Sequence, residues 1–371
     1  MRRTFKYRLY PTPAQETAMQ TTLDECRWLY NRLLEERKLA WDETDTSLSR
    51  YQQVNRIPAL KKERPSLDSV HSQVLQNVAS RVDLAFAAFF RRVKDGEEPG
   101  YPRFRGKGRY DSFCYPGSGF KIASDGHHVV LSKIGSVKAV IHRPVAGGVK
   151  TCCVSRASTG KWYVCFSCEV DAETAGPAPV SAVGLDVGLT AFATMSDGTE
   201  IENPRFLRTA EKALAKAQRR HAKERKGTAA RAKKRKVLAR VHERIAHRRD
   251  NFAHQAAHKL VTRHGTVAVE DLRVKNMVQN HCLAKSIHDT AWALFIALLA
   301  YKAENAGRRY IAVNPAYTTQ DCSRCGHRQA MPLSERVYRC SQPDCLLVLP
   351  RDVNAARNIL RLGLQSLAHT A

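Results

Sequence analysis

Three acidic residues stand where strands or helices are expected to begin or end, and together they could bind divalent cations. Asp186 lies in the otherwise apolar run 183–188 (VGLDVG), and Glu270 follows the apolar stretch 266–269. Asp352 begins the last expected helix. Each residue also has an ordinary explanation: a strand-end Asp bonded to backbone N–H groups, a Glu entering a loop, and a helix N-cap.

The chemistry that three converging carboxylates would support is metal-assisted phosphodiester cleavage. Carboxylate oxygens are the hard ligands that Mg²⁺ prefers. Two such ions, about 3.5–4 Å apart, stabilise both the attacking and the leaving oxygen of a phosphodiester. Convergence requires that distant segments meet at one edge of a sheet.

A second group of residues has the spacing of a zinc site. Cys322 and Cys325 are separated by two residues and followed by Gly326, whereas Cys340 and Cys345 are separated by four. Four thiolates predict a tetrahedral Zn²⁺ site. Such a site is structural, because the four protein ligands leave no position open for a substrate. The alternative is a set of free buried cysteines. The odd total of eleven cysteines and this late cluster favour a reduced compartment and a metal site over disulfides.

The remaining cysteines give no such signal. Cys165 and Cys168 are also separated by two residues, but they lie in an expected strand, where positions three apart face opposite sides. Cys152 and Cys153 are interpreted as packing or surface residues.

The charge of the chain predicts a polyanionic partner. Its 371 residues contain 61 Lys+Arg against 35 Asp+Glu, a formal charge of +26 and a pI near 9.9. Such an imbalance destabilises a compact chain unless an anion binds. No apolar run approaches the roughly 20 residues that span a bilayer. The first residues lack the apolar stretch of a signal peptide. We therefore expect a cytoplasmic, nucleic-acid-binding protein with no membrane partner.

Two segments are candidates for contact with nucleic acid. Residues 205–249 carry 18 Lys+Arg and 3 Glu, a net +15, on an expected helical stretch, 205–260, with an apolar edge. The cations singled out there are Arg219, Arg220, Lys233, Lys234, Arg235 and Lys236. In 101–115, Arg103, Arg105, Lys107 and Arg109 alternate with aromatic residues, which suits phosphate contact and base stacking. The alternatives are a solvated face and a loop that packs its aromatics.

Hydrophobic periodicity and residues typical of helix ends predict the helices and strands around these residues. Residues 5–10 alternate as a strand, and Thr12 to Gln15 form a capping box before a helix that runs through Leu34. A second helix is expected at about 70–93, and 121–170 is β-rich. The linker 175–179 marks the main domain boundary. Beyond it we expect strands at 183–188, 266–269 and 310–313, and an amphipathic helix marked by Ile287, Ala291, Leu294, Leu298 and Tyr301. The last helix should end at Gly363.

Several motifs, in order along nearly the whole chain, resemble TnpB, a family of insertion-sequence proteins related to type V CRISPR effectors. They are GLDVG at 184–188, VEDL at 269–272, TQDCSRCG at 319–326 and RDVNAARNI at 351–359, with YRLYPT at 7–12 and GYPRF at 100–104.

This resemblance implies a multidomain α/β fold: an RNase H-like (RuvC) nuclease core with an inserted zinc ribbon, and an N-terminal β-barrel-like wedge domain with a helical insertion. The wedge domain would comprise 1–12 and 96–175, and the helical recognition domain 13–95. The nuclease domain would comprise 180–317 and 347–371, interrupted by the zinc ribbon at 318–346.

The resemblance also implies an RNA-guided DNA endonuclease. Asp186, Glu270 and Asp352 match the family's catalytic acids, which bind two Mg²⁺. Its partners would be a guide RNA and double-stranded target DNA beside a short flanking motif, with one protein chain in the ribonucleoprotein. The alternatives are a guided DNA-binding regulator without cleavage, an RNase H-like transposase and a structural zinc-ribbon DNA binder. Retention of all three acids disfavours the regulator.

Overall fold

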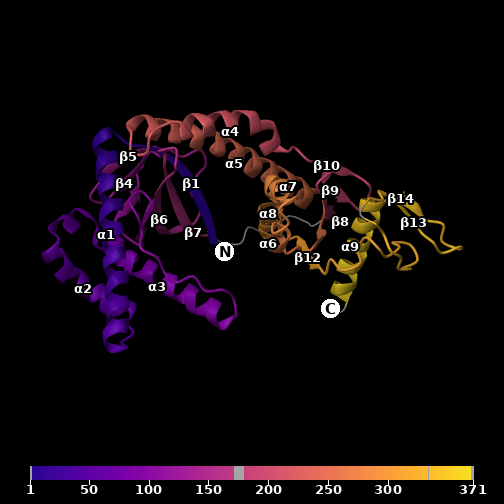
Figure 1. Cartoon of the computed structure of the whole chain (residues 1–371), viewed down its shortest axis with the longest axis horizontal. Coiled ribbons are helices and arrows are strands. Elements are labelled where there is room, and N and C mark those ends of the chain that lie inside the picture. The colour runs from indigo at the N-terminus through magenta and orange to yellow at the C-terminus, as the bar shows by residue number, and fades with distance from the viewer. Residues whose placement is uncertain (1, 171–178, 333, 369–371) are drawn as a thin grey trace. The chain divides into compact units, whose positions relative to one another are not determined.

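The computed structural model describes residues 2–170, 179–332 and 334–368. The chain divides into two compact units, residues 1–171 and 172–371, which are described separately (Figure 1). Most of the expected linker, residues 175–178, lies outside the described residues. None of the helices in the described ranges is long and apolar enough to cross a membrane.

The first unit is built on a seven-stranded antiparallel sheet. Its strands are β1 (Arg2–Tyr10), β2 (Ser112–Pro116), β3 (Phe120–Ile122), β4 (His128–Leu131), β5 (Gly135–Val140), β6 (Gly148–Arg156) and β7 (Trp162–Glu169), in the order β2-β6-β7-β1-β5-β4-β3. Tyr115 of edge strand β2 donates a hydrogen bond to the Ser132 carbonyl, just after β4, at 2.9 Å. The sheet therefore curls until its two ends approach each other, as a barrel-like domain requires.

Helices cover this sheet and share its core. They are α1 (Pro13–Thr44), α2 (Arg50–Glu63), the 3₁₀ helix η1 (Pro65–Ser69) and α3 (Ser72–Lys94). The predicted capping box is present: Thr12 accepts from the Gln15 backbone, and the Gln15 side chain accepts from the Thr12 backbone. Helix α2 was not predicted. It contains Pro58 and buries only Gln53, Ile57 and Leu60, so it carries a weak periodic signal.

One cysteine prediction is wrong in the first unit. Cys153 is neither a packing thiol nor a surface thiol but forms a disulfide with Cys114. The two residues lie directly opposite each other in the antiparallel pair β2–β6. Side chains at such positions are close neighbours, and that proximity depends on strand register rather than on sequence spacing.

The second unit contains a five-stranded mixed sheet. Its strands are β8 (Ala182–Val187), β9 (Ala191–Met195), β10 (Glu200–Glu202), β11 (Thr266–Glu270) and β12 (Arg309–Val313), in the order β10-β9-β8-β11-β12. Strands β8, β9 and β10 are antiparallel neighbours, whereas β11 runs parallel to both β8 and β12. The predicted α/β fold is therefore confirmed, and the barrel-like sheet belongs to the first unit.

Helices lie on both faces of this sheet. They are α4 (Phe206–Ala222), α5 (Ala229–Arg263), α6 (Val274–Met277), α7 (Ala284–Thr290), α8 (Trp292–Asn305) and α9 (Arg351–Ala368). Val183, Leu185, Val267 and Val269 share a core with α5 and α8. Ala268 on the opposite face packs with Ile359 of α9, and Figure 1 shows α9 beside β8.

Two helix boundaries differ from prediction. Helix α9 continues past Gly363, because this glycine is needed for close packing rather than for a cap: a Cβ there would lie 2.7 Å from the Ala268 Cβ. The helix expected through Ile287 and Tyr301 is broken at Ala291, whose φ is 55°. The break shifts the buried face to Trp292, Phe295 and Leu299, and leaves Tyr301 exposed.

Candidate functional site

Strand parity places the three predicted acids on one side of the second sheet. Gly184 and Ala268 pair in register and face α9. Asp186 and Glu270 lie two residues further along their parallel strands, so they face the same side. Asp352 lies in the first turn of α9, the helix that covers this face. The structure therefore brings together side chains that are more than 80 residues apart in sequence.

Asp186 lies close enough to Glu270 and Asp352 for their charges to act on it. Burial, and then the charges of Glu270 and Asp352, raise the pKa of Asp186 well above its usual range, while Arg351 acts in the opposite direction. Burial also raises the pKa of Glu270. A half-buried carboxylate such as Asp186, whose ionised form is disfavoured by burial and by two neighbouring acids, fits a divalent-cation site, because a cation would neutralise the charge.

Glu270 also has a hydrogen-bond donor that the sequence analysis missed. The Thr318 hydroxyl donates to Glu270 Oε1 at 2.6 Å, and this bond lowers the pKa of Glu270 against the effect of burial. Thr318 is buried, lying between β12 and the first cysteine. A Thr at that spacing carries no local signal for contact with a residue 48 positions earlier.

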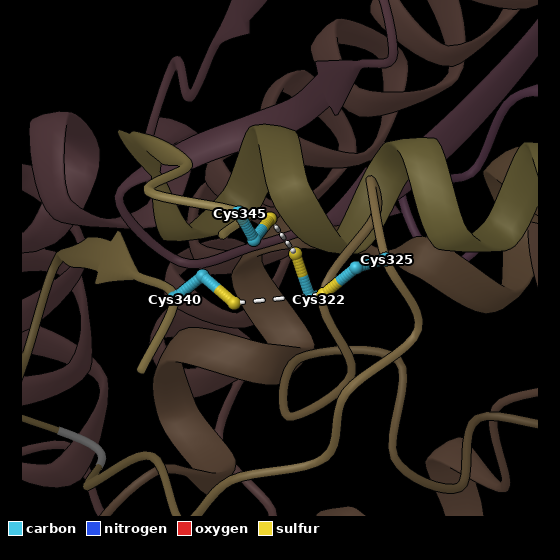
Figure 2. A group of neighbouring side chains, drawn as sticks. All are labelled: Cys322, Cys325, Cys340 and Cys345. Carbon is cyan, nitrogen blue, oxygen red and sulfur yellow. Dashed lines mark hydrogen bonds between the residues drawn. The ribbon is translucent and has the colours of Figure 1, made fainter. Parts of the chain in front are cut away.

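The four predicted cysteines converge (Figure 2). All four Sγ atoms lie within 4.8 Å of one another, and the Cys322–Cys345 and Cys325–Cys340 sulfur pairs are each 3.6 Å apart. A tetrahedral zinc site with Zn–S bonds of about 2.3 Å has sulfur–sulfur edges of about 3.8 Å. The cluster therefore fits a zinc ion, with no ligand position left open.

Local backbone geometry accommodates both cysteine spacings. Gly326 donates to the Cys322 carbonyl at 2.9 Å with φ 79°, a conformation that favours glycine. The longer second spacing is taken up by a turn in which Cys345 N donates to the Gln342 carbonyl, followed by Leu346 with φ 50°. Strands β13 (Val337–Arg339) and β14 (Val348–Pro350) pair beside the cluster.

The thiols of the cluster differ in acidity: burial raises the pKa of Cys340 to about 12 and also raises the pKa of Cys345, whereas the pKa of Cys322 is lowered. Burial acts to raise the pKa of Cys322, but backbone N–H groups of Cys325 and Arg324 and hydrogen bonds from neighbouring thiols lower it to about 7. A lowered thiol pKa favours the thiolate, the form that binds metal.

Two buried asparagines of α9 tie the cysteine segment to the helix that carries Asp352. Asn354 Nδ2 donates to the Asp321 carbonyl at 2.8 Å, and its Oδ1 accepts from Ser323 N at 2.9 Å. Asn358 Nδ2 donates to the carbonyls of Thr318 and Asp321 at 2.9 and 2.7 Å. Hydrogen bonds therefore connect the cysteine segment to α9, the helix of Asp352, and through Thr318 to Glu270.

The predicted basic residues are available to a partner. On α4 and α5, Arg219, Arg220, Lys233, Arg235 and Lys236 are exposed and Lys234 is half-buried. In the loop before β2, Arg103, Arg105, Lys107 and Arg109 are exposed. Arg105 is also held locally: its backbone exchanges two hydrogen bonds with the Asn31 side chain, and its guanidinium lies over the Tyr30 ring.

Comparison with known proteins identifies the family. A protein of Streptomyces pristinaespiralis named "Putative RNA-guided DNA endonuclease" is 36% identical over 376 residues, covering 99% of this chain and 91% of the relative. The chain belongs to the TnpB family. InsQ of Escherichia coli K12, named in the same way, is 31% identical over 97% of this chain and 92% of its own.

Three family descriptions match different parts of this TnpB-family chain. Residues 165–281, with Asp186 and Glu270, match OrfB_IS605, "Probable transposase". Residues 292–359, with the four cysteines and Asp352, match "Cas12f1-like, TNB domain". Residues 1–46 match "Helix-turn-helix domain", although here they form strand β1 and the single long helix α1 up to Thr44.

A solved structure shares the fold. It is described as the structure of the mini-RNA-guided endonuclease CRISPR-Cas_phi3, and it covers 98% of this chain and 92% of its own with a TM-score of 0.50 and 10% identity. At that identity the likeness supports the α/β fold of the TnpB family and nothing finer.

Asp289 is a further buried residue whose contacts were not predicted. It accepts from the backbone N–H groups of Leu207 and Arg208 at 2.7 and 3.3 Å, and from Arg249 at 2.8 Å. It therefore caps α4 from a distant helix and pairs with α5. Only the contact between elements reveals this role, because the local sequence of α4 has no capping side chain.

Proposed function

We propose that this protein is an RNA-guided DNA endonuclease that cleaves guide-complementary DNA beside a short flanking motif, and that it is associated with a transposable element. The observation that carries the proposal is that Asp186 and Glu270 face the same side of one sheet, and that α9, whose first turn carries Asp352, covers that side. The family supports the guide and the DNA substrate, since relatives covering nearly the whole chain are named as RNA-guided DNA endonucleases.

The three carboxylates would hold Mg²⁺ ions beside the phosphodiester that is to be cleaved. When bound, two Mg²⁺ ions supply stabilisation of both the attacking and the leaving oxygen. The sheet order β10-β9-β8-β11-β12, with antiparallel pairing from β10 to β8 and parallel pairing from β8 to β12, supports an RNase H-like (RuvC) interpretation of this unit. The cysteine cluster would hold a structural Zn²⁺.

The other segments would then bind nucleic acid. We assign the curled sheet, with 1–12 and 96–175, as the wedge domain, and 13–95 as the helical recognition domain. The nuclease domain would comprise 180–317 and 347–371, with the zinc ribbon at 318–346. The basic helices within 205–260 suit the backbone of a guide–target duplex, because their cations are exposed along two helices. One protein chain would act with one guide RNA.

A direct experiment tests the function. The protein is purified from its host, co-purifying RNA is sequenced, and DNA matching that RNA is incubated with and without Mg²⁺. We expect cleavage that requires both the match and the metal. Mismatched DNA is the control for guidance. Binding of matched DNA without any cleavage would instead support the regulator alternative.

A further inference from the structure

Thr318 occupies a position from which it can control one carboxylate of the proposed centre. Thr318 is only 2% exposed, and its hydroxyl lies 2.6 Å from Glu270 Oε1. The next acceptor, the Pro315 carbonyl, is farther away at 3.2 Å. A hydroxyl has one proton to donate, and the shorter contact to a carboxylate is the stronger bond.

The Thr318 backbone is held by the helix that carries a second acid. Asn358, which is 1% exposed, donates to the Thr318 carbonyl at 2.9 Å and to the Asp321 carbonyl at 2.7 Å. Asn354 holds the same segment through Asp321 and Ser323. Both asparagines lie within two turns of Asp352 on α9. A hydrogen-bonded path therefore joins Glu270 to α9 through residue 318.

The same segment leads directly into the cysteine cluster. Asp321 and Ser323 flank Cys322, which is fully buried, and the Cys322 backbone donates to the His327 carbonyl at 2.9 Å. A metal ion that fixes the positions of the four cysteines would therefore also restrict the backbone of residues 318–323. Those residues in turn contact both the Glu270 side chain and α9.

We propose that Thr318 is a positioning residue that orients Glu270 relative to Asp352, so that the cysteine cluster orders the carboxylate centre as well as its own segment. This inference rests on the proposed nuclease function. Glu270 ends β11 and has a long side chain that can rotate away from its crowded acidic neighbours. A fixed donor at Oε1 restricts that rotation, and the carboxylate keeps lone pairs for a cation. Outer-shell partners of metal ligands affect metal affinity or activity in this way.

The test compares three variants of the full chain with its guide RNA. Thr318→Val keeps the shape of the side chain but removes the hydroxyl, and Thr318→Ser keeps the hydroxyl. Thr290→Val is the matched control, because Thr290 is also buried in this unit but donates to the Ile287 carbonyl at 2.8 Å. The measurements are zinc content, melting temperature, target affinity, single-turnover cleavage rate, and Mn²⁺ affinity by electron paramagnetic resonance.

We expect Thr318→Val to slow cleavage about 10- to 100-fold and to weaken Mn²⁺ binding, because outer-shell changes have effects of that size. Zinc content and target affinity should stay at wild-type values. Thr318→Ser should restore the rate to within a few-fold of wild type, and Thr290→Val should cleave normally. This pattern separates positioning from packing, since both valine variants remove a buried hydroxyl.

Other outcomes overturn the inference. Wild-type cleavage and Mn²⁺ affinity in Thr318→Val would show that the hydroxyl does not position Glu270. Loss of zinc or of folding in Thr318→Val would show a packing role alone. If the wild-type protein does not cleave matched DNA, the proposed function fails, and Mn²⁺ affinity still decides the role of Thr318 separately.

Discussion

At the scale of single residues, the carboxylate centre is a balance between repulsion and cation binding. Asp186 is half-buried beside two other acids, and both its burial and their charges oppose its ionisation. Arg351 acts against this effect on the pKa of Asp186, and the hydrogen bond from Thr318 lowers the pKa of Glu270. The residues that tune the centre therefore lie next to the acids in space and, in the case of Thr318, far away in sequence.

Replacing Asp186 with Asn should abolish cleavage while guide-dependent DNA binding persists. The change removes a predicted metal ligand but leaves the shape of the strand intact. Since binding to the native state alone raises stability, the rise in melting temperature on adding Mg²⁺ should also disappear. Thermal melts with and without Mg²⁺, together with cleavage assays, measure both effects.

Asp250→Asn is the matched control, because it makes the same change of charge at an exposed position of α5. It should leave cleavage and the Mg²⁺ effect unchanged. Substantial cutting by Asp186→Asn would rule out the assigned centre. Because the acids act as a unit, adding Glu270→Gln to Asp186→Asn should lower activity little further.

The cysteine cluster should contain one zinc per chain and lose it in Cys322→Ser. Metal binding to such sites contributes apparent free energies on the order of 10 kcal/mol that are coupled to local folding. We therefore expect a lower melting temperature for the variant and for the chelated wild type, with zinc measured by elemental analysis. Cys282→Ser, at an exposed cysteine outside the cluster, should retain both zinc and stability. Well-folded wild-type protein without zinc would refute the assignment.

At the scale of elements, the position of Asp352 depends on how closely α9 approaches the sheet. Two glycines permit that approach. A Cβ on Gly184 would collide with the Ala356 carbonyl oxygen, and one on Gly363 would lie 2.7 Å from the Ala268 Cβ. The obstructing atoms are backbone or short side-chain atoms, which cannot rotate out of the way.

Gly184→Ala should therefore destabilise the second unit by about 1–3 kcal/mol or more, as overpacking does. It should also slow cleavage by moving α9, and Asp352 with it, away from β8. Denaturant unfolding and cleavage rates measure the two effects. Gly106→Ala is the control, because its Cβ would meet no atom within 4 Å. A Gly184→Ala protein with wild-type stability would contradict the packing inferred for α9.

Helices α4 and α5 depend on one buried carboxylate. Asp289 is 5% exposed, caps α4 and pairs with Arg249 of α5. Removing one partner of a buried ion pair leaves the other charge uncompensated, so Asp289→Ala should destabilise the unit by about 3–5 kcal/mol. Glu211→Ala, which removes partly exposed surface pairs with Arg208 and Lys285, should change stability far less, because water screens surface ion pairs. Equal melting temperatures of the two variants would show that Asp289 does not hold these helices.

At the scale of the whole molecule, charge is unevenly distributed. More than half of the formal +26 lies within residues 205–249, mostly on α4 and α5. A dense cationic surface of this kind is costly to the isolated chain and favours a polyanion. The proposed guide–target duplex would provide that polyanion.

Changing Lys233, Lys234, Arg235 and Lys236 together to Gln should weaken binding for every guide and target alike. The log–log salt dependence should become shallower by about 0.7 to 0.9 for each phosphate that the variant no longer neutralises. Exchanging Lys and Arg at these four positions keeps the charge and should preserve the slope. Filter binding over a range of salt concentrations measures both. If affinity and slope do not change in the Gln variant, this surface is only solvated, and phosphate-binding residues should be sought near Arg103 and Arg105.

Much of the fold and site could be predicted from sequence because the signals are local. The Thr12 capping box, the alternation of β1 and the apolar strands around Asp186 and Glu270 depend on neighbours a few residues apart. The cysteine motif likewise identifies its four residues by their type and spacing along the chain. The family motifs, in order, then relate the three acids to one another.

Tertiary structure alone decided the rest, because those features depend on how distant segments pair. The Cys114–Cys153 disulfide follows from the register of β2 with β6, and no local residue type marks the left-handed backbone at Ala291 that separates α7 from α8. The Thr318–Glu270 bond spans 48 residues, and the Asp289 contacts with α4 span 81 and 82. No local pattern encodes such contacts, since a buried polar side chain gains its partner only when packing brings the two segments together.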